Sequence, residues 1–464
     1  MKRITTLFVL VMLATPAFGQ QEGALTEDLM QSLRSSVTMD APTKAMMNAI
    51  TKNDVRSLAL DHQVAISNDM HFTNKIATQG VTDQQKSGRC WLFAGLNILR
   101  PVASETTKEK AFEFSQTYLF FYDKLEKSNL FLESIIATRE KPVEDREVQW
   151  LLKHPFADGG QWNMVLALVE KYGVVPADIM PETTSSSNTG RLNQLMSAKL
   201  VRDAYLLRSK SESGASEATL RAEKERMLTE VYRMLVLHIG MPPQQFTWRY
   251  DDENGKASDP VTYTPKEFYN EFVKVKLADY VCLHSVPVHP FGKAYQVQFD
   301  RNLVDSPNMT FVNVDIQTMK EYTLKSVLGG DPVWFGCDVG KESDSKLGVM
   351  RRGLYDYESI YGMEFDMPKK ERILYGQSIP SHAMVFTGVD LIDGKPQKWL
   401  VENSWGTDVG EKGMFSMYDS WYDEYMFSVI IHKKYLPEAT LALYQGGDAE
   451  VLPPWDPLFA VEPR

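Results

Sequence analysis

Bulky apolar residues recur at intervals of three and four along the first half of the chain, and this spacing predicts helices. The strongest pattern runs from Phe114 to Ile136. A second helix is expected from about Cys90 to about Leu99, and a third within residues 159–176, which begin with two glycines. Residues 20–80 also have a mainly helical pattern, with polar breaks. The first half is therefore predicted to be mostly helical.

The second half of the chain has a different pattern of apolar and polar residues. From about Thr262, short β-rich runs are separated by Gly, Pro and Asp, which is typical of an antiparallel sheet or barrel. A helical half followed by a β-rich half predicts an α+β fold.

Between the halves lie two Ser-rich stretches, 181–190 and 208–216, which we interpret as exposed loops. The helix expected after them carries an apolar stripe. We interpret this middle region as an inserted helical subdomain. The stripe consists of Leu220, Met227, Val231 and Met234.

The N-terminus has the pattern of a cleavable export signal. Lys2 and Arg3 form a basic head, residues 4–14 are largely apolar, and Ala17 to Gly19 fit a small-x-small cleavage site. The apolar run is about half of the roughly 20 residues that span a bilayer, so the alternative is a short buried helix. We expect export to the periplasm or the medium, with no membrane-spanning segment.

The expected units follow from these patterns. They are a signal peptide (1–19), a helical half with Cys90 (20–180), an inserted helical or hook subdomain (181–261), a β-rich half (262–450) and a C-terminal arm (451–464).

Charge and cysteine content narrow the functional classes. The 464-residue chain has a net charge of −11, which makes it a poor partner for nucleic-acid phosphates. Three cysteines are too few for a disulfide scaffold; Cys282 and Cys337 could pair, which would leave Cys90 free. An unpaired thiol in an oxidising compartment is a liability unless it is used.

Cys90 alone could be a structural residue, half of a disulfide, a metal ligand or a nucleophile. It stands at the start of a predicted helix, where the N-terminal partial charge favours a thiolate. His382 begins one β-rich run and Asn403 ends another, and an Asn oxygen can hold an imidazole in the right tautomer. Gln84 could donate to an oxyanion, and Trp405 could keep water from the His–Asn hydrogen bond.

The order Gln, Cys, His, Asn favours a nucleophilic thiol. The sequence contains no HExxH or CxxC motif, so we expect no metal and no organic cofactor.

Several segments carry a resemblance to the papain-superfamily cysteine peptidases, and within them to the bleomycin hydrolase and aminopeptidase C family. They are QQKSGRCWLFA, FEFSQTYLFFYDKLEKSN, DGGQWNM, FGCDVGK, HAMVFTGVD, VENSWG and PPWDP, spread from about residue 80 to the C-terminus. The resemblance implies a papain-like fold. It also implies roles for Cys90 as nucleophile, His382 as general base and then acid, Asn403 as its orienting group, Gln84 in the oxyanion hole, and Gly159 and Gly160 as backbone that pairs with the substrate.

Two features depart from ordinary secreted papains, whose signature is C-G-[SA]-C-[WY]. Ser87 replaces the first Cys, which those enzymes use in a disulfide, and Arg89 directly precedes Cys90. His382 follows Cys90 by 292 residues, whereas about 130–150 are usual, and the inserted middle region accounts for the excess. Both departures favour the bleomycin hydrolase branch.

The resemblance further implies that the C-terminal arm lies along the cleft, so that the terminal carboxylate, here of Arg464, meets the free amine of a peptide substrate. It also implies a homo-hexamer. The ending LFAVEPR departs from the small, apolar ending expected in the family, and the tail could instead be a disordered exit.

Our leading hypothesis is a thiol-dependent aminopeptidase that starts from a thiolate–imidazolium pair. The alternatives are an endopeptidase with a mobile or trimmed arm, and a non-catalytic, barrel-forming binding protein.

Overall fold

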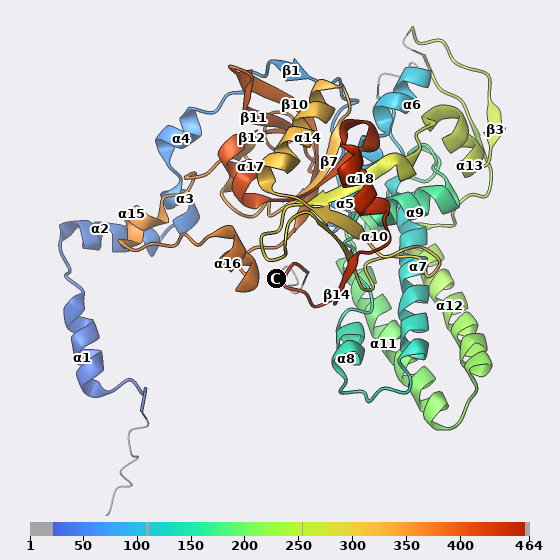
Figure 1. Cartoon of the computed structure of the whole chain (residues 1–464), viewed down its shortest axis with the longest axis horizontal. Coiled ribbons are helices and arrows are strands. Elements are labelled where there is room, and N and C mark those ends of the chain that lie inside the picture. Colours follow the sequence, from blue (N-terminus) through green and yellow to red (C-terminus); the bar gives the residue numbers. More distant parts are fainter. Residues whose placement is uncertain (1–21, 108–110, 253, 460–464) are drawn as a thin grey trace, which may run out of the picture.

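A computed structural model describes residues 22–107, 111–252 and 254–459. One large mixed sheet lies beside a lobe of long helices, and short N-terminal helices extend away from both (Figure 1). The fold is α+β, as the sequence predicts.

Helices dominate the part of the chain before residue 240. The three helices expected around Cys90, after Phe114 and after Gly160 are confirmed. Each begins and ends within a few residues of the predicted limits. They belong to the set α5 (Cys90–Asn97), α6 (Arg100–Thr107), α7 (Gln116–Ala137), α8 (Arg146–Lys153) and α9 (Trp162–Tyr172).

The middle region is a long helical hairpin packed on α7. Its elements are α10 (Thr184–Ser187), α11 (Gly190–Glu212) and α12 (Glu217–Ile239). Leu220, Met227 and Val231 are buried as predicted, but Met234 is only half-buried.

Both predicted loops of the middle region are partly wrong. Residues 208–212 continue α11, and the turn is confined to residues 213–216, where Gly214 has a φ of +85°. Serine weakens a helix only slightly, so the Ser-rich composition did not end it. In the other stretch, Thr183 and Ser186 form a capping box that starts α10.

The sheet runs in the order β14-β5-β6-β4-β13-β7-β10-β11-β12-β9-β8, and β1 pairs with β10. Most pairs are antiparallel; β4–β6, β14–β5 and β12–β9 are parallel. Its strands are β1 (Asn74–Lys75), β4 (Tyr280–His284), β5 (Lys293–Val297), β6 (Thr310–Asn313), β7 (Val333–Cys337), β8 (Ser343–Asp344), β9 (Val349–Met350), β10 (His382–Ile392), β11 (Lys395–Glu402), β12 (Met414–Tyr418), β13 (Met426–His432) and β14 (Glu450–Leu452). A separate hairpin pairs β2 (Phe246–Trp248) with β3 (Val261–Tyr263).

Most helices of the second half cover the large sheet or connect its strands, whereas α13 packs beside α9 and β3. They are α13 (Pro265–Phe268), α14 (Ile316–Leu328), α15 (Tyr357–Tyr361), α16 (Lys369–Leu374), α17 (Asp419–Tyr425) and α18 (Glu438–Gln445).

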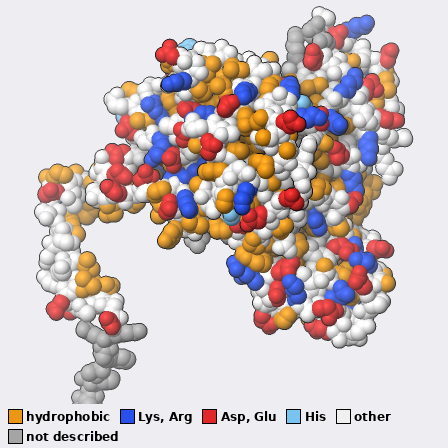
Figure 2. Space-filling view, viewed as in Figure 1, with side chains coloured by type: hydrophobic (Ala, Val, Ile, Leu, Met, Phe, Trp, Pro, Cys, Tyr) orange, Lys and Arg blue, Asp and Glu red, His pale blue; other side chains and the backbone are white. Residues whose placement is uncertain are grey.

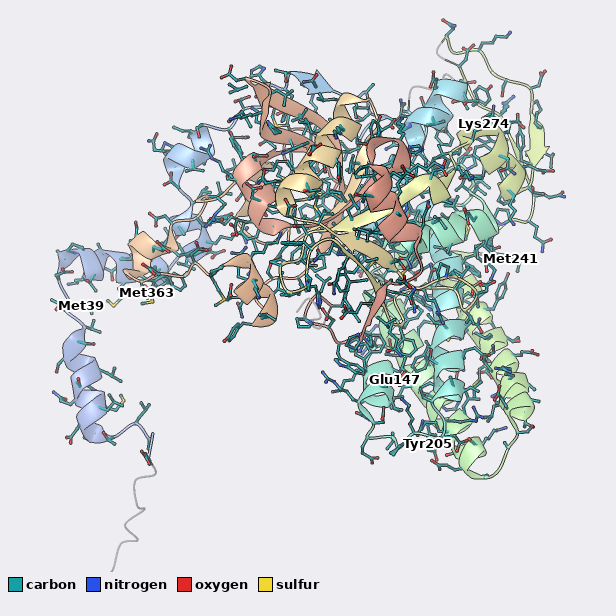
Figure 3. The ribbon with its side chains drawn as sticks, viewed as in Figure 1. Met39, Glu147, Tyr205, Met241, Lys274 and Met363 are labelled. Atoms are coloured by element: carbon teal, nitrogen blue, oxygen red, sulfur yellow. The ribbon has the colours of Figure 1, made fainter. Side chains whose placement is uncertain are left out.

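The N-terminal helices are α1 (Glu27–Ser36), α2 (Ala41–Ile50), α3 (Val55–Ala59) and α4 (His62–Ile66). No residue of α1 or α2 is buried. Apolar side chains show on this extension in Figure 2, and Figure 3 places Met39 on it, well away from the sheet. The predicted signal peptide, residues 1–19, lies outside the described residues. Within the described ranges no helix is both long and apolar enough to cross a membrane.

Cys90, Cys282 and Cys337 are all free thiols. Cys282 lies on β4 and Cys337 on β7, with β13 between these strands, and both side chains are buried. The pairing that the sequence allowed is therefore absent.

Candidate active site

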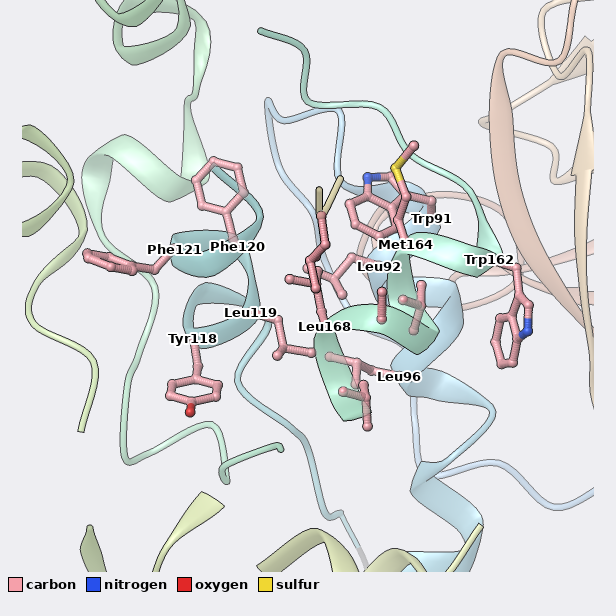
Figure 4. Close-up of a cluster of buried hydrophobic side chains, with 14 of the residues drawn as sticks. Trp91, Leu92, Leu96, Tyr118, Leu119, Phe120, Phe121, Trp162, Met164 and Leu168 are labelled. Carbon is pink, nitrogen blue, oxygen red and sulfur yellow. The ribbon is translucent and has the colours of Figure 1, made fainter. Parts of the chain in front are cut away.

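Cys90 is the first residue of α5, at the junction between the helical lobe and the sheet. Behind it, apolar side chains of α5, α7 and α9 interlock, among them Leu92, Leu119 and Leu168 (Figure 4). The indole N–H of Trp91 donates to the carbonyl of Asp158 at 2.8 Å. Helix packing therefore fixes where the thiol points.

Opposing effects act on the pKa of the Cys90 thiol. Burial raises the pKa of the Cys90 thiol to about 11, although backbone N–H groups of Ala383, Trp91 and Cys90 itself oppose this rise. The Ala383 contact places the sulfur at the start of β10, one residue after His382.

His382 is held by a buried amide. Its Nε2 lies 2.9 Å from Oδ1 of Asn403, and the Trp405 ring stacks on the imidazole with a centroid separation of 4.7 Å. Burial lowers the pKa of His382 to about 4, against the effect of the Asn403 hydrogen bond. Burial favours the uncharged form of both Cys90 and His382, which works against the resting thiolate–imidazolium pair expected from the sequence.

Strand register determines the position of the imidazole. His382 pairs with Cys337 of β7, and β11 delivers Asn403 from the other neighbouring strand. The structure thus brings together His382 and Asn403, and the Trp405 ring stacks on the imidazole.

Gln84 is held at both ends of its side chain. Its Nε2 donates to the Ser87 carbonyl at 2.6 Å, and its Oε1 accepts from the Ser404 hydroxyl at 2.7 Å. Ser404 also donates its backbone N–H to Asn403 Oδ1 at 2.7 Å. Ser404, which sequence reasoning missed, therefore connects the oxyanion candidate to the His-orienting amide. Its place directly after Asn403 was the available signal.

The two glycines differ in their surroundings. A Cβ on Gly160 would lie 2.6 Å from the Trp91 indole, so this position needs glycine. Gly159 has open space on that side, while its carbonyl accepts from Lys127 Nζ at 2.7 Å. Gly159 is therefore exposed, and its carbonyl is already engaged by Lys127.

A buried ion pair supports this loop. Lys124 Nζ lies 2.6 Å from Asp158 Oδ1, and Asp158 Oδ2 accepts the backbone N–H of Gly88 at 3.1 Å. Burial alone would raise the pKa of Asp158, but Lys124 and the hydrogen bonds from Thr189 and Gly88 hold it well below its usual value. Sequence analysis missed this pair because a lone Lys and Asp ordinarily indicate solvent exposure.

The described part of the C-terminal arm is packed against the body. Strand β14 pairs with β5, and Asp456 Oδ1 lies 3.1 Å from His289 Nε2. The Arg146 guanidinium lies 4.5 Å from the Trp455 ring centroid. Arg464 lies outside the described residues.

The described ranges contain no group of three or more His, Cys, Asp or Glu side chains that could hold a metal ion.

A thiol at a helix start, beside the residue that follows an imidazole oriented by an amide oxygen, is the arrangement of the cysteine-type hydrolases. The Peptidase C1-like family profile matches residues 24–459, and the chain belongs to this family.

Similar proteins cover nearly the whole chain. Aminopeptidase C of Streptococcus thermophilus is 40% identical over 438 residues, covering 94% of this chain and 98% of that protein. Bleomycin hydrolase of Homo sapiens is 36% identical over 449 residues, with the same coverage. The crystal structure of PepW from Lactobacillus rhamnosis HN001 superposes with a TM-score of 0.91 at 39% identity, covering 94% of this chain and 99% of that one.

Proposed function

We propose that Cys90, His382, Asn403 and Gln84 carry the cysteine-type aminopeptidase activity to which family membership assigns this chain. The observation that carries this proposal is the His382–Asn403 contact at 2.9 Å, with the Cys90 sulfur beside the next residue, Ala383.

The reaction needs only these groups and water. His382 takes the thiol proton, and the sulfur attacks the carbonyl carbon of the first peptide bond. The oxyanion lies near Gln84 and the Cys90 amide. The C–N bond breaks, and the amine leaves with the proton from His382. Water, deprotonated by His382, then attacks the thioester and releases the amino acid while the thiol is restored.

The protonation state before attack is open to measurement. A resting ion pair would give a rate of Cys90 alkylation by iodoacetamide that is already constant below pH 7. A neutral thiol would give a rate that rises with pH toward the thiol pKa of about 11.

We further propose the finer architecture. The hairpin of α11 and α12 supports an inserted subdomain at 181–261, and the region 262–450 supports a β-barrel half. Export is proposed from the sequence pattern of residues 1–19, and a homo-hexamer is proposed from the family. Intact-mass measurement of protein from the native cell tests cleavage near Gly19, because retention of residues 1–19 contradicts it.

Cleavage at the N-terminus of a peptide, rather than within it, is attributed to the C-terminal arm. The described part of the arm is anchored through Asp456 and Trp455, and this anchoring supports the proposal that the terminal carboxylate meets the substrate amine. Hydrolysis of aminoacyl amides with a free amine is compared with that of N-blocked peptides, on the full chain and on a chain lacking residues 460–464. We expect the full chain to prefer the free amine and the shortened chain to gain activity on blocked peptides. Preference of the full chain for blocked peptides would favour an endopeptidase instead.

A further inference from the structure

A completely buried arginine directly precedes Cys90. Arg89 is the N-cap residue of α5, and its Nη1 and Nη2 each lie 2.9 Å from one carboxylate oxygen of Glu182. Its Nε donates to the Ser87 hydroxyl at 2.9 Å. The Phe120 ring lies 5.0 Å from the guanidinium carbon. A forked, bidentate contact of this kind fixes direction as well as distance, which a lysine cannot do.

The contacts of Arg89 continue to Gln84. The Ser87 hydroxyl, which accepts from Arg89, donates to the Gln84 carbonyl at 2.6 Å. In return, the Gln84 side-chain amide donates to the Ser87 carbonyl at 2.6 Å. Two hydrogen bonds therefore join Gln84 and Ser87, and Arg89 adds a third, to the Ser87 hydroxyl, from the buried side of the loop.

The loop from Gln84 to Ser87 needs these hydrogen bonds because its backbone is strained. Gln85, which lies between Gln84 and Ser87, has a φ of +53°, in the left-handed region that a non-glycine residue adopts at a cost in free energy. Gln85 is exposed, so packing around its own side chain does not hold the conformation. The loop keeps its shape through its hydrogen bonds, and Arg89 supplies the one that reaches Ser87 from the helix.

We propose that Arg89 and Glu182 are positioning residues that hold the Gln84 side chain ready for the oxyanion. The inference rests on the proposed function, because it requires Gln84 to be the oxyanion donor. Arg89 contacts no reacting atom in this scheme. It acts through Ser87, and Glu182 acts through Arg89.

The test is a double-mutant cycle between Arg89→Met and Gln84→Ala, with kcat and KM measured on an aminoacyl amide. Loss of one oxyanion donor costs about 10²- to 10³-fold in kcat, so we expect that loss for Gln84→Ala. Arg89→Met should lower kcat by about tenfold or more, but by no more than Gln84→Ala does. It should leave KM nearly unchanged, because the oxyanion exists only in the transition state. In the Gln84→Ala background, Arg89→Met should have almost no further effect on kcat.

Two further measurements separate positioning from a general effect on the fold. Alkylation of Cys90 by iodoacetamide needs the sulfur but no oxyanion donor, so its rate should stay within about twofold in Arg89→Met. An aminoacyl aldehyde forms a tetrahedral adduct on the thiol, so its affinity should fall in parallel with kcat. Arg372→Met is the matched control: this buried arginine bonds Glu424 at 2.7 Å and contacts neither Ser87 nor Gln84, and kcat should be unaffected.

Other outcomes overturn the inference in recognisable ways. An equal loss in both backgrounds, or alkylation that falls with kcat, means that Arg89 does not act through Gln84. Unchanged kcat in Gln84→Ala refutes the oxyanion role itself, whereas a loss there with none in Arg89→Met refutes only the positioning. If Arg89→Met does not fold, Arg89→Lys and Glu182→Gln replace it in the same cycle, with a smaller loss expected because the charge or the arginine remains.

Discussion

The two sides of the candidate active site are held by different forces. On the cysteine side, two fully buried cations fix the loop and the helix start: Lys124, which pairs with Asp158, and Arg89, which pairs with the partly exposed Glu182. On the histidine side, His382 is placed by strand register, and aromatic packing by Trp405 covers it. One side depends on single contacts between distant residues, while the other depends on many backbone hydrogen bonds.

This difference has consequences for mutation. Removing one partner of a buried ion pair leaves an uncompensated charge, whereas removing a side chain from a strand leaves the ladder intact. We therefore expect structure and chemistry to be coupled on the cysteine side and separable on the histidine side. The following predictions test that comparison.

The largest expected effect is on activity alone. His382→Ala should lower kcat by about 10²- to 10⁴-fold, since it removes the general base. The free energy of unfolding should change little, because Asn403 Oδ1 keeps the Ser404 N–H and the pairing of β10 with β7 is backbone to backbone. Steady-state kinetics and urea unfolding measure the two quantities. A large loss of stability would contradict the proposed separation.

On the cysteine side the expected effect is on stability. Lys124→Met should lower the free energy of unfolding by about 3–5 kcal/mol, because Asp158 would remain buried without its partner. The matched control is Lys398→Met on β11, whose partner Asp69 is half exposed, so that its loss costs about 0–1 kcal/mol.

Urea unfolding of both variants measures the difference. Adding Asp158→Asn to Lys124→Met should recover part of the loss, because the unpaired charge is then gone. Equal costs for Lys124→Met and Lys398→Met would remove the distinction between the two sides.

The third prediction concerns acid. His284 of β4 is buried against Phe311, both ring nitrogens lack a hydrogen-bond partner, and burial lowers its pKa to about 3. The unfolded chain binds a proton at this residue below about pH 6.5 and the folded chain does not, so stability is fully present above that pH and falls as the pH drops toward 3. About 2 kcal/mol should be lost between pH 6.5 and pH 5 from this group.

His284→Leu should reduce the slope of unfolding free energy against pH in this window. His62→Leu, at an exposed position on α4, serves as the control with which the slope of His284→Leu is compared. An unchanged slope in His284→Leu would show that the folded protein accommodates the charge.

Local patterns in the sequence predicted the regular elements well, and long-range pairs poorly. Apolar spacing located α7 and α9, and the β-rich runs located β7, β10 and β11, because periodicity is a property of neighbouring residues. By contrast, Lys124 and Asp158 are separated by 34 positions and carry no periodic signal, so nothing local marks them as buried partners.

For the site, the sequence pattern suggested the chemical types, and the fold supplies the supports. The contact of His382 with Asn403 follows from the roles that a Cys–His pair needs, and could be expected before the fold was seen. The part played by Ser404 could not, because it depends on a loop that brings Gln84 within 2.7 Å of a residue 320 positions away.

The smallest predicted effect is at Trp405, where the histidine side depends on one side chain. Its ring stacks at 29° on His382, whose Nε2 lies 2.9 Å from Asn403 Oδ1. Trp405→Ala should lower kcat by about 2- to 13-fold, which corresponds to the 0.5–1.5 kcal/mol of a stacked aromatic pair. Trp405→Phe, which keeps a ring there, should retain most of the activity. A loss as large as that of His382→Ala would mean that the imidazole is held by packing rather than by strand register, and the contrast between the two sides would fail.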